Sequence, residues 1–217
     1  MLLAKRGRSI TTEASNQKVL RHFTRHRASL VNAQTASKLR IHTLVDQLLP
    51  GFLDEKQSGL SPFCRASLWL MEERFSPAQI RARRTSSLNH HLQLLNIKKP
   101  EPTVEKLKAL AASVLPPPPA LVGALQYSLS REISVLRALE ENIQQLHLQI
   151  VLALVLTPGA FLTTLKGVGI TLAAGIYAEL SDPVHLQGVS RTASFAGLVP
   201  RTRQTGGPDK PARSCRR

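Results

Sequence analysis

The sequence is poor in aromatic residues and in cysteine, and each shortage removes a class of function. Phe, Trp and Tyr make up 4% of the 217 residues, too few for a sheet that stacks RNA bases on aromatic side chains. The two cysteines, Cys64 and Cys215, lie far apart and have no CxxC partner. This usage indicates a reducing cytoplasmic compartment and no structural zinc.

Long hydrophobic runs are also missing. The most apolar run, residues 150–156, stops at Pro158-Gly159 and is too short to span a bilayer. The first residues, MLLAKRGRS, have too few apolar residues before their charges to form a signal peptide. A membrane is therefore not an expected partner.

Acidic residues are few, so the chain is strongly basic. The 29 Lys and Arg residues outnumber the 14 Asp and Glu residues and give a formal net charge of +15. Such a charge repels itself unless an anionic partner neutralises it, and nucleic acid is the remaining candidate. Residues 1–27 carry seven Lys and Arg against one acid, and residues 201–217 carry six against one. These runs predict two cationic arms, although solvated tails would have the same composition.

Hydrophobic spacing predicts helices along the whole chain and no strand. Apolar residues at steps of three and four predict a long amphipathic helix over 15–49 and another over 120–156. An ordinary helical core would show the same spacing as the heptad seam in the second helix. The partner of that seam is either the 15–49 helix or the same helix of a second subunit. The seam consists of Leu136, Leu139, Ile143, Leu146 and Ile150.

Shorter helices are expected between the two long ones. Ser61 and Ser76, each followed by proline, predict N-caps for helices over 62–75 and 77–95. Thr103 is expected to cap a helix that ends at Val114, and the prolines of 116–119 predict a stiff spacer.

The predicted fold class is all-α, with long helices forming an antiparallel coiled-coil-like hairpin followed by a small helix-hairpin-helix domain. Residues 1–60 are expected to form a basic arm and a connecting helix, and residues 61–119 short helices and a linker. Residues 120–156 form the long helix, and residues 157–217 the C-terminal domain with its basic tail.

The helix-hairpin-helix pattern lies at the start of the C-terminal domain. Gly167-Val168-Gly169 separates an apolar segment from an apolar helix predicted over 170–180. The two glycines allow a tight turn and leave the first amides of the second helix bare, which makes a phosphate site. Lys166 adds a cation beside it. The predicted DNA contacts are therefore Lys166, Gly167, Val168, Gly169 and Thr171, although a simple helix–helix turn also uses glycine.

Catalytic residues are harder to find. The histidines are scattered, no Walker A loop is present, and no set of metal ligands can be assembled, so no metal site is predicted. Thr205 stands before Gly206-Gly207 among basic residues, and its hydroxyl could attack a phosphodiester. On sequence alone, a glycine-rich turn after a polar residue is the simpler explanation. The basic residues expected to contact DNA are Arg201, Arg203, Lys210 and Arg213.

Three pieces of this region together resemble a known family. They are the hairpin GVGITLAA, the segment AGLVP at 196–200, and Thr205-Gly206-Gly207. Leu165 to Gly207 resembles the C-terminal domain of the insertion-sequence transposases of the IS-one-ten family. Residues 20–52 resemble the long helix that joins the catalytic domain of this family to its coiled coil.

The resemblance implies a transposase or recombinase polypeptide acting on double-stranded DNA, with a structured guide RNA as a further partner. The family carries an N-terminal RuvC-like domain whose four acids hold magnesium, and a C-terminal serine that attacks DNA. The four acids cannot be placed in this sequence, so no cofactor is expected in this chain. Mg²⁺ is expected only together with the missing RuvC-like domain. Thr205 takes the place of the nucleophile, and Ser214 is a weaker candidate.

The sequence is thus expected to be a transposase fragment, truncated at both ends, that binds DNA and does not cut it alone. It is expected to assemble with itself or with an intact transposase through the 120–156 helix. Two alternatives remain. One is a non-catalytic DNA- or RNA-binding protein that regulates a transposase, and the other is a helical structural protein whose charge serves solubility.

Overall fold

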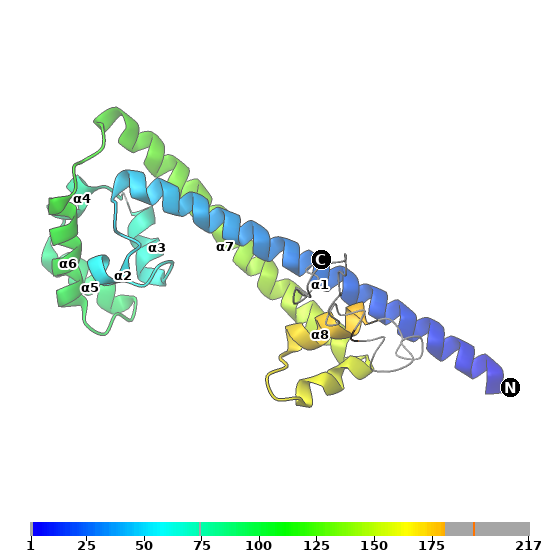
Figure 1. Ribbon diagram of the computed structural model, residues 1–217. Coiled ribbons are helices and arrows are strands. Elements are labelled where there is room, and N and C mark those ends of the chain that lie inside the picture. The colour runs from blue at the N-terminus through cyan, green and yellow to red at the C-terminus, as the bar shows by residue number, and fades with distance from the viewer. Residues whose placement is uncertain (1, 74, 181–192, 194–217) are drawn as a thin grey trace, which may run out of the picture. The chain divides into compact units, whose positions relative to one another are not determined.

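A computed structural model describes residues 2–73, 75–180 and 193, and these residues form helices and connecting segments without a strand (Figure 1). This confirms the predicted all-α class. Two helices are long, namely α1 (Leu2–Leu48) and α7 (Pro119–Val155). Between them the chain forms α2 (Glu55–Ser58), α3 (Arg65–Glu72), α4 (Pro77–Ala82), α5 (Thr85–Leu94) and α6 (Pro100–Ser113). After α7 come the 3₁₀ helix η1 (Pro158–Thr164) and α8 (Ile170–Glu179).

The chain divides into two compact units, and each unit takes part of both long helices. One unit consists of residues 1–25 and 147–217, and the other of residues 26–146. The first unit therefore contains the start of α1, the end of α7, η1 and α8. The second contains the rest of the two long helices together with α2 to α6.

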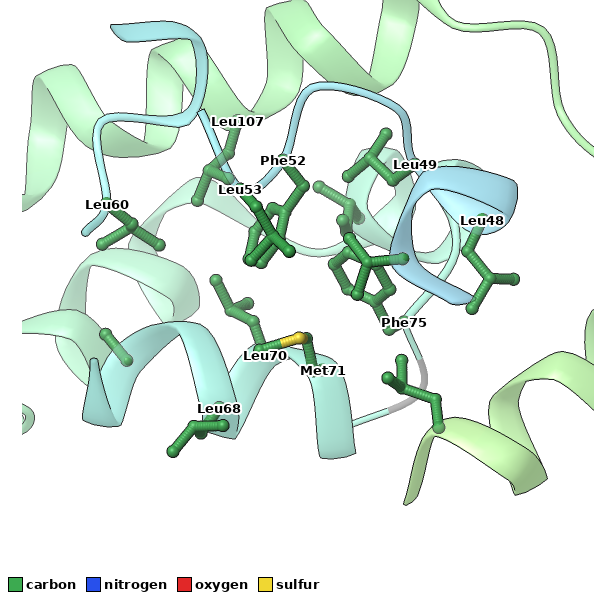
Figure 2. Packing of buried hydrophobic residues seen from close by; sticks show 14 of the residues in the cluster. Leu48, Leu49, Phe52, Leu53, Leu60, Leu68, Leu70, Met71, Phe75 and Leu107 are labelled. Carbon is green, nitrogen blue, oxygen red and sulfur yellow. The ribbon is translucent and has the colours of Figure 1, made fainter. Parts of the chain in front are cut away.

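The 26–146 unit is built around one hydrophobic cluster. Phe52 and Phe75 meet edge to face in it, with ring centroids 4.6 Å apart. Figure 2 shows Leu70 and Met71 of α3 on one side of these rings and Leu107 of α6 on another. Leucine and isoleucine side chains from both long helices also belong to the cluster. Burial of these side chains is the main force that holds the short helices to α1 and α7.

Within this unit α1 and α7 run antiparallel, side by side. The Ser37 hydroxyl donates to Glu132 Oε2 (3.0 Å), and Gln34 Nε2 donates to Glu140 Oε1 (3.1 Å). From the first pair to the second, the residue number falls along α1 and rises along α7, so the two helices are antiparallel. Leu136 of the predicted seam is fully buried in the hydrophobic cluster with residues of α1. In this unit the partner of the seam is therefore α1.

Several helix boundaries differ from the sequence prediction. Helix α1 begins at Leu2, where the prediction began near Ser15. Helix α3 begins at Arg65 with Cys64 as its N-cap, and Cys64 Sγ accepts from the Ser67 amide. The predicted cap, Ser61, instead donates its hydroxyl to Glu55 (3.0 Å). The cap at Ser76 is confirmed, since its side chain accepts from the amide of residue 79.

Two further differences concern the 77–95 segment and the start of α6. The predicted 77–95 helix breaks because Arg83 is extended and donates to the Glu73 carbonyl (2.7 Å). The Arg83 guanidinium also lies 5.4 Å from the Trp69 ring centre. Helix α6 begins at Pro100, so Thr103 lies inside its first turn and is not the cap. Proline at this first position satisfies the usual rule for a helix start.

The end of α7 is apolar, and the chain turns sharply between α7 and η1. Thr157 follows it, and its buried hydroxyl donates to the Leu154 carbonyl (2.8 Å). Pro158 then opens η1. Within the described residues, no single helix is long and apolar enough to cross a membrane; α7 and η1, bent by 107°, pass that test only as a pair, by length and composition.

Replacing Phe52 by alanine should lower the free energy of unfolding of the 26–146 unit by about 3–5 kcal/mol, because it removes a fully buried ring. Urea titration followed by the fluorescence of Trp69, the one tryptophan of the chain, measures this change. Leu115→Ala is the control, since Leu115 is 90% exposed and should change stability by no more than about 0.5 kcal/mol. Equal effects of the two variants would contradict the packing shown in Figure 2.

Candidate nucleic-acid interface

The turn between η1 and α8 is held by close packing of the two helices. Gly159 in η1 is buried, and a Cβ at that position would lie 2.6 Å from the Tyr177 ring of α8. Only glycine allows this approach. On α8, Ala173, Ala174 and Ala178 are fully buried, and their small size lets neighbouring elements come near. The packing fixes the direction in which α8 begins.

The turn itself needs only one of its two glycines. Gly167 has a φ of +92°, which a residue with a side chain adopts at a cost. Gly169 has φ −79° and ψ 168°, which are open to any residue, and a Cβ there would meet nothing within 4 Å. The Val168 amide donates to the Leu165 carbonyl (3.0 Å) and closes the turn. Gly169 is therefore dispensable for the conformation.

Gly169 is also the N-cap of α8, and no side chain caps this helix end. The first amide of α8 that bonds back along the helix belongs to Ala173, which donates to the Gly169 carbonyl (2.9 Å). The amides of Ile170, Thr171 and Leu172 precede it and have no helical acceptor. With the positive end of the helix dipole, these amides favour an anion.

Lys166 is the charged side chain of this turn, residues 165–172. Lys166 is exposed and has no acidic partner among the described residues. Gly167 and Gly169 are exposed as well, while Val168 and Thr171 are half-buried. The five residues predicted here from the sequence thus lie together in one turn and in the first turn of α8.

The other predicted site residues lie outside the described residues. They are the candidate nucleophiles Thr205 and Ser214 and the basic residues Arg201, Arg203, Lys210 and Arg213.

The opposite end of α8 is held by side chains of α1, which the sequence analysis did not predict. Gln17 Nε2 donates to the carbonyls of Tyr177 (3.1 Å) and Leu180 (2.6 Å). Arg21 Nε donates to the Ala178 carbonyl (2.9 Å). The last carbonyls of a helix have no internal partner, so these bonds cap the C-terminus of α8. We call Gln17, Arg21 and Arg25 the α8 clasp.

Arg25 completes the α8 clasp with an ion pair. Its Nε and Nη2 atoms donate to the two carboxylate oxygens of Glu179 at 2.9 and 3.1 Å. The hydrogen bond from Arg25 holds the pKa of Glu179 below its ordinary value of 4.5, although burial acts in the opposite direction. Glu179 in turn raises the pKa of Arg25. The pair is a two-point contact between α8 and α1.

The α8 clasp changes the interpretation of the basic N-terminal run. Arg21 and Arg25 were counted as cations of a binding arm, yet both are used to hold α8. The spacing of Gln17, Arg21 and Arg25, with steps of four, places them on one helix face and could have indicated a shared partner. The partner, α8, lies more than 150 residues away, so the sequence around these three residues does not identify it.

Metal ligands do not gather in the part of the chain that is described. No group of three His, Cys, Asp or Glu side chains there lies close enough to hold a metal ion. The described residues therefore do not fit the magnesium site that the resemblance assigns to a RuvC-like domain. No step of the chemistry below depends on a metal.

The C-terminal part of the chain is similar to a known protein family. Residues 159–217 match the model of the family described as "Transposase IS116/IS110/IS902 family". No curated protein matches the chain. No solved structure matches it either. The matched segment begins in η1, includes the turn and α8, and extends through the predicted basic tail.

The match supports a transposase role of the kind found in insertion sequences. Residues 159–217 are similar to the IS116/IS110/IS902 transposase family, which confirms the resemblance seen in the sequence. Because transposases act on DNA, this similarity suggests DNA as the partner.

Glu179→Gln should weaken the acid sensitivity of α8. Because the pKa of Glu179 is lowered in the folded protein, its contribution to stability is present above pH 4.5 and is lost as the pH falls through the folded value. Protection of the α8 amides against hydrogen exchange, corrected for the intrinsic rate, should therefore fall less between about pH 5 and pH 3 in the variant than in the wild type. Glu105→Gln, an exposed carboxylate of α6, is the control. Identical pH profiles for wild type and Glu179→Gln would show that the ion pair does not stabilise α8.

Proposed function

We propose that this transposase-family protein grips duplex DNA through the turn of residues 166–171. The observation that carries the proposal is the uncapped N-terminus of α8, which follows a turn with the exposed Lys166 and two exposed glycines. Bare amides, a helix dipole and a nearby ammonium group together bind a phosphate without reading the base sequence.

Charge elsewhere in the family segment supports the same role. Residues 201–217 follow α8 in the sequence and carry six Lys and Arg residues against one acid. A basic run of this kind adds phosphate contacts, each of which releases counterions from the DNA. The turn would fix the position of the backbone, and the basic run would supply much of the affinity.

Thr205 and Ser214 remain the proposed nucleophiles. In such a step the hydroxyl oxygen bonds to phosphorus while the bond from phosphorus to a deoxyribose oxygen breaks, and the hydroxyl proton ends on the departing oxygen. Arg201 and Arg203, close to Thr205 in the sequence, would stabilise the charge that develops on the phosphate.

A second candidate function is a non-catalytic DNA-binding partner of an intact transposase. The observation that favours it is an apolar stripe on α7, where Leu148, Leu152 and Val155 are 61–69% exposed and follow one another by four and three residues. An exposed stripe with this spacing suits a second helix. The two candidates share the DNA contact and differ in oligomeric state, which light scattering of the protein with and without a transposase partner measures.

Binding to duplex DNA should weaken steeply with salt. If phosphate contacts dominate, the logarithm of the affinity falls linearly with the logarithm of the salt concentration, by about 0.9 for each phosphate neutralised. Fluorescence anisotropy with duplexes of two unrelated sequences, over a range of salt concentrations, measures this slope. Equal slopes are expected for the two sequences. An affinity that stays flat between low and physiological salt would refute the proposal.

Gly169→Asp should weaken duplex binding and leave α8 intact. The backbone at Gly169 accepts any residue and a Cβ there is unobstructed, so the aspartate would cap the bare amides that we assign to phosphate. We expect a loss of affinity of roughly tenfold or more, since each 1.4 kcal/mol is a factor of ten. Anisotropy gives the affinity, and circular dichroism the helix content.

Gly175→Asp is the matched control for this variant. Gly175 also lies on α8, also faces open space, and gains the same charge away from the helix N-terminus. Its effect on affinity should be several times smaller. If both variants weakened binding equally, net charge alone would explain the loss, and the turn would not be the contact.

A further inference from the structure

A groove opens in the 26–146 unit, where the C-terminal part of α1 lies beside the start of α7. Its volume is about 460 Å³, within the usual range of about 300–1,000 Å³ for small-molecule sites. The side chains of α1 that line it include Arg40, Thr43 and Leu44, and those of α7 include Tyr127, Arg131 and Glu132. None of these residues belongs to the turn proposed above as the duplex contact.

The charge in this groove is positive because its one carboxylate is already paired. Glu132 Oε1 accepts from Arg40 Nε at 2.8 Å, and Glu132 Oε2 accepts from the Ser37 hydroxyl at 3.0 Å. These bonds also fix α1 against α7 at the floor of the groove. Arg131 has no acidic partner among the described residues. Its guanidinium group is therefore available to an anion.

An exposed aromatic ring stands beside this free cation. Tyr127 is 68% exposed, and the other Phe, Trp and Tyr residues described in the 26–146 unit are buried or half-buried. The Arg131 guanidinium carbon lies over the Tyr127 ring, 5.8 Å from the ring centre, so the cation and the ring form one contact pair. A flat aromatic face next to a guanidinium group is the combination that binds an aromatic base and its phosphate.

We propose that this groove binds an unpaired nucleotide of a single-stranded nucleic acid. The base stacks on Tyr127, and the adjacent phosphate pairs with Arg131. Charge complementarity supports this occupant, because the chain carries a net charge of +15 and Arg131 in the groove has no acidic partner among the described residues. In a duplex the base faces are already stacked on one another, so the ring selects an unpaired strand. This site is separate from the turn at 166–171 and does not depend on it.

The experiment compares two probes on the full-length chain. Anisotropy is measured with labelled oligo(dT) of about 12 nucleotides, a length in the range of single-strand binding sites, and with a duplex of the same length. Tyr127→Leu should raise the Kd for oligo(dT) about five- to a hundredfold, because base stacking is lost. Tyr127→Phe keeps the ring and should stay within about twofold of the wild type. Neither variant should change the Kd for duplex by more than about twofold.

A charge variant tests the phosphate contact separately. Arg131→Gln should lower the salt slope for oligo(dT) by about 0.7, the value for one phosphate on a single strand. Arg65→Gln is the matched control, since Arg65 is an exposed arginine of the same unit that lies outside the groove. It should leave the slope for oligo(dT) nearly unchanged.

The outcomes separate this proposal from the duplex contact. If Tyr127→Leu and Tyr127→Phe bind oligo(dT) as the wild type does, or if Arg131→Gln behaves like Arg65→Gln, the groove is not a nucleotide site. A Tyr127→Leu protein that loses duplex binding to the same extent would also overturn the proposed selectivity. Suppose that Gly169→Asp leaves duplex binding intact while Tyr127→Leu still weakens oligo(dT) binding. The proposed duplex contact at the turn is then wrong, and the proposed nucleotide site in the groove is supported.

Discussion

The capping of α8 by α1 is the contact on which the candidate DNA interface depends. A short helix is marginal on its own, and α8 has only ten residues. Gln17 and Arg21 supply donors to its last carbonyls, and Arg25 pairs with Glu179. Because the C-terminal end is held in this way, the N-terminal end can remain uncapped without loss of the helix. The contacts that stabilise α8 are thus at its C-terminal end, and the backbone donors without an acceptor are at its N-terminal end.

This division of roles also explains why two glycines that look equivalent in the sequence are not equivalent in the structure. Gly167 is needed for the backbone conformation, since the chain turns there with a positive φ. Gly169 has an ordinary conformation and open space around it, so glycine is not required there by the fold. A serine or aspartate would cap α8 better. Because glycine has no side chain, it does not cap these amides, which are the ones proposed to bind a phosphate.

Much of the helical architecture could be predicted from hydrophobic spacing, because that spacing is a local property. The helix predicted over 120–156 is found at Pro119–Val155, and Ser76 caps α4 as expected. The prediction of a single 77–95 helix was wrong because a side-chain contact outside the helix decided the local conformation. The 77–95 segment has a continuous helical pattern, yet it breaks at Arg83, whose guanidinium group binds the Glu73 carbonyl and lies over Trp69. Hydrophobic spacing alone does not predict that contact.

The sequence by itself determined that the chain is helical, strongly basic, and turned at Gly167-Val168-Gly169, since composition and short-range spacing fix these properties. Only the tertiary structure decided which charges are free to meet a partner. Arg21 and Arg25 are engaged with α8, and Arg40 is engaged with a glutamate, whereas Arg131 has no acidic partner among the described residues. All of these arginines look alike in the sequence. Folding distinguishes them, because the availability of a charge depends on neighbours that lie far apart along the chain.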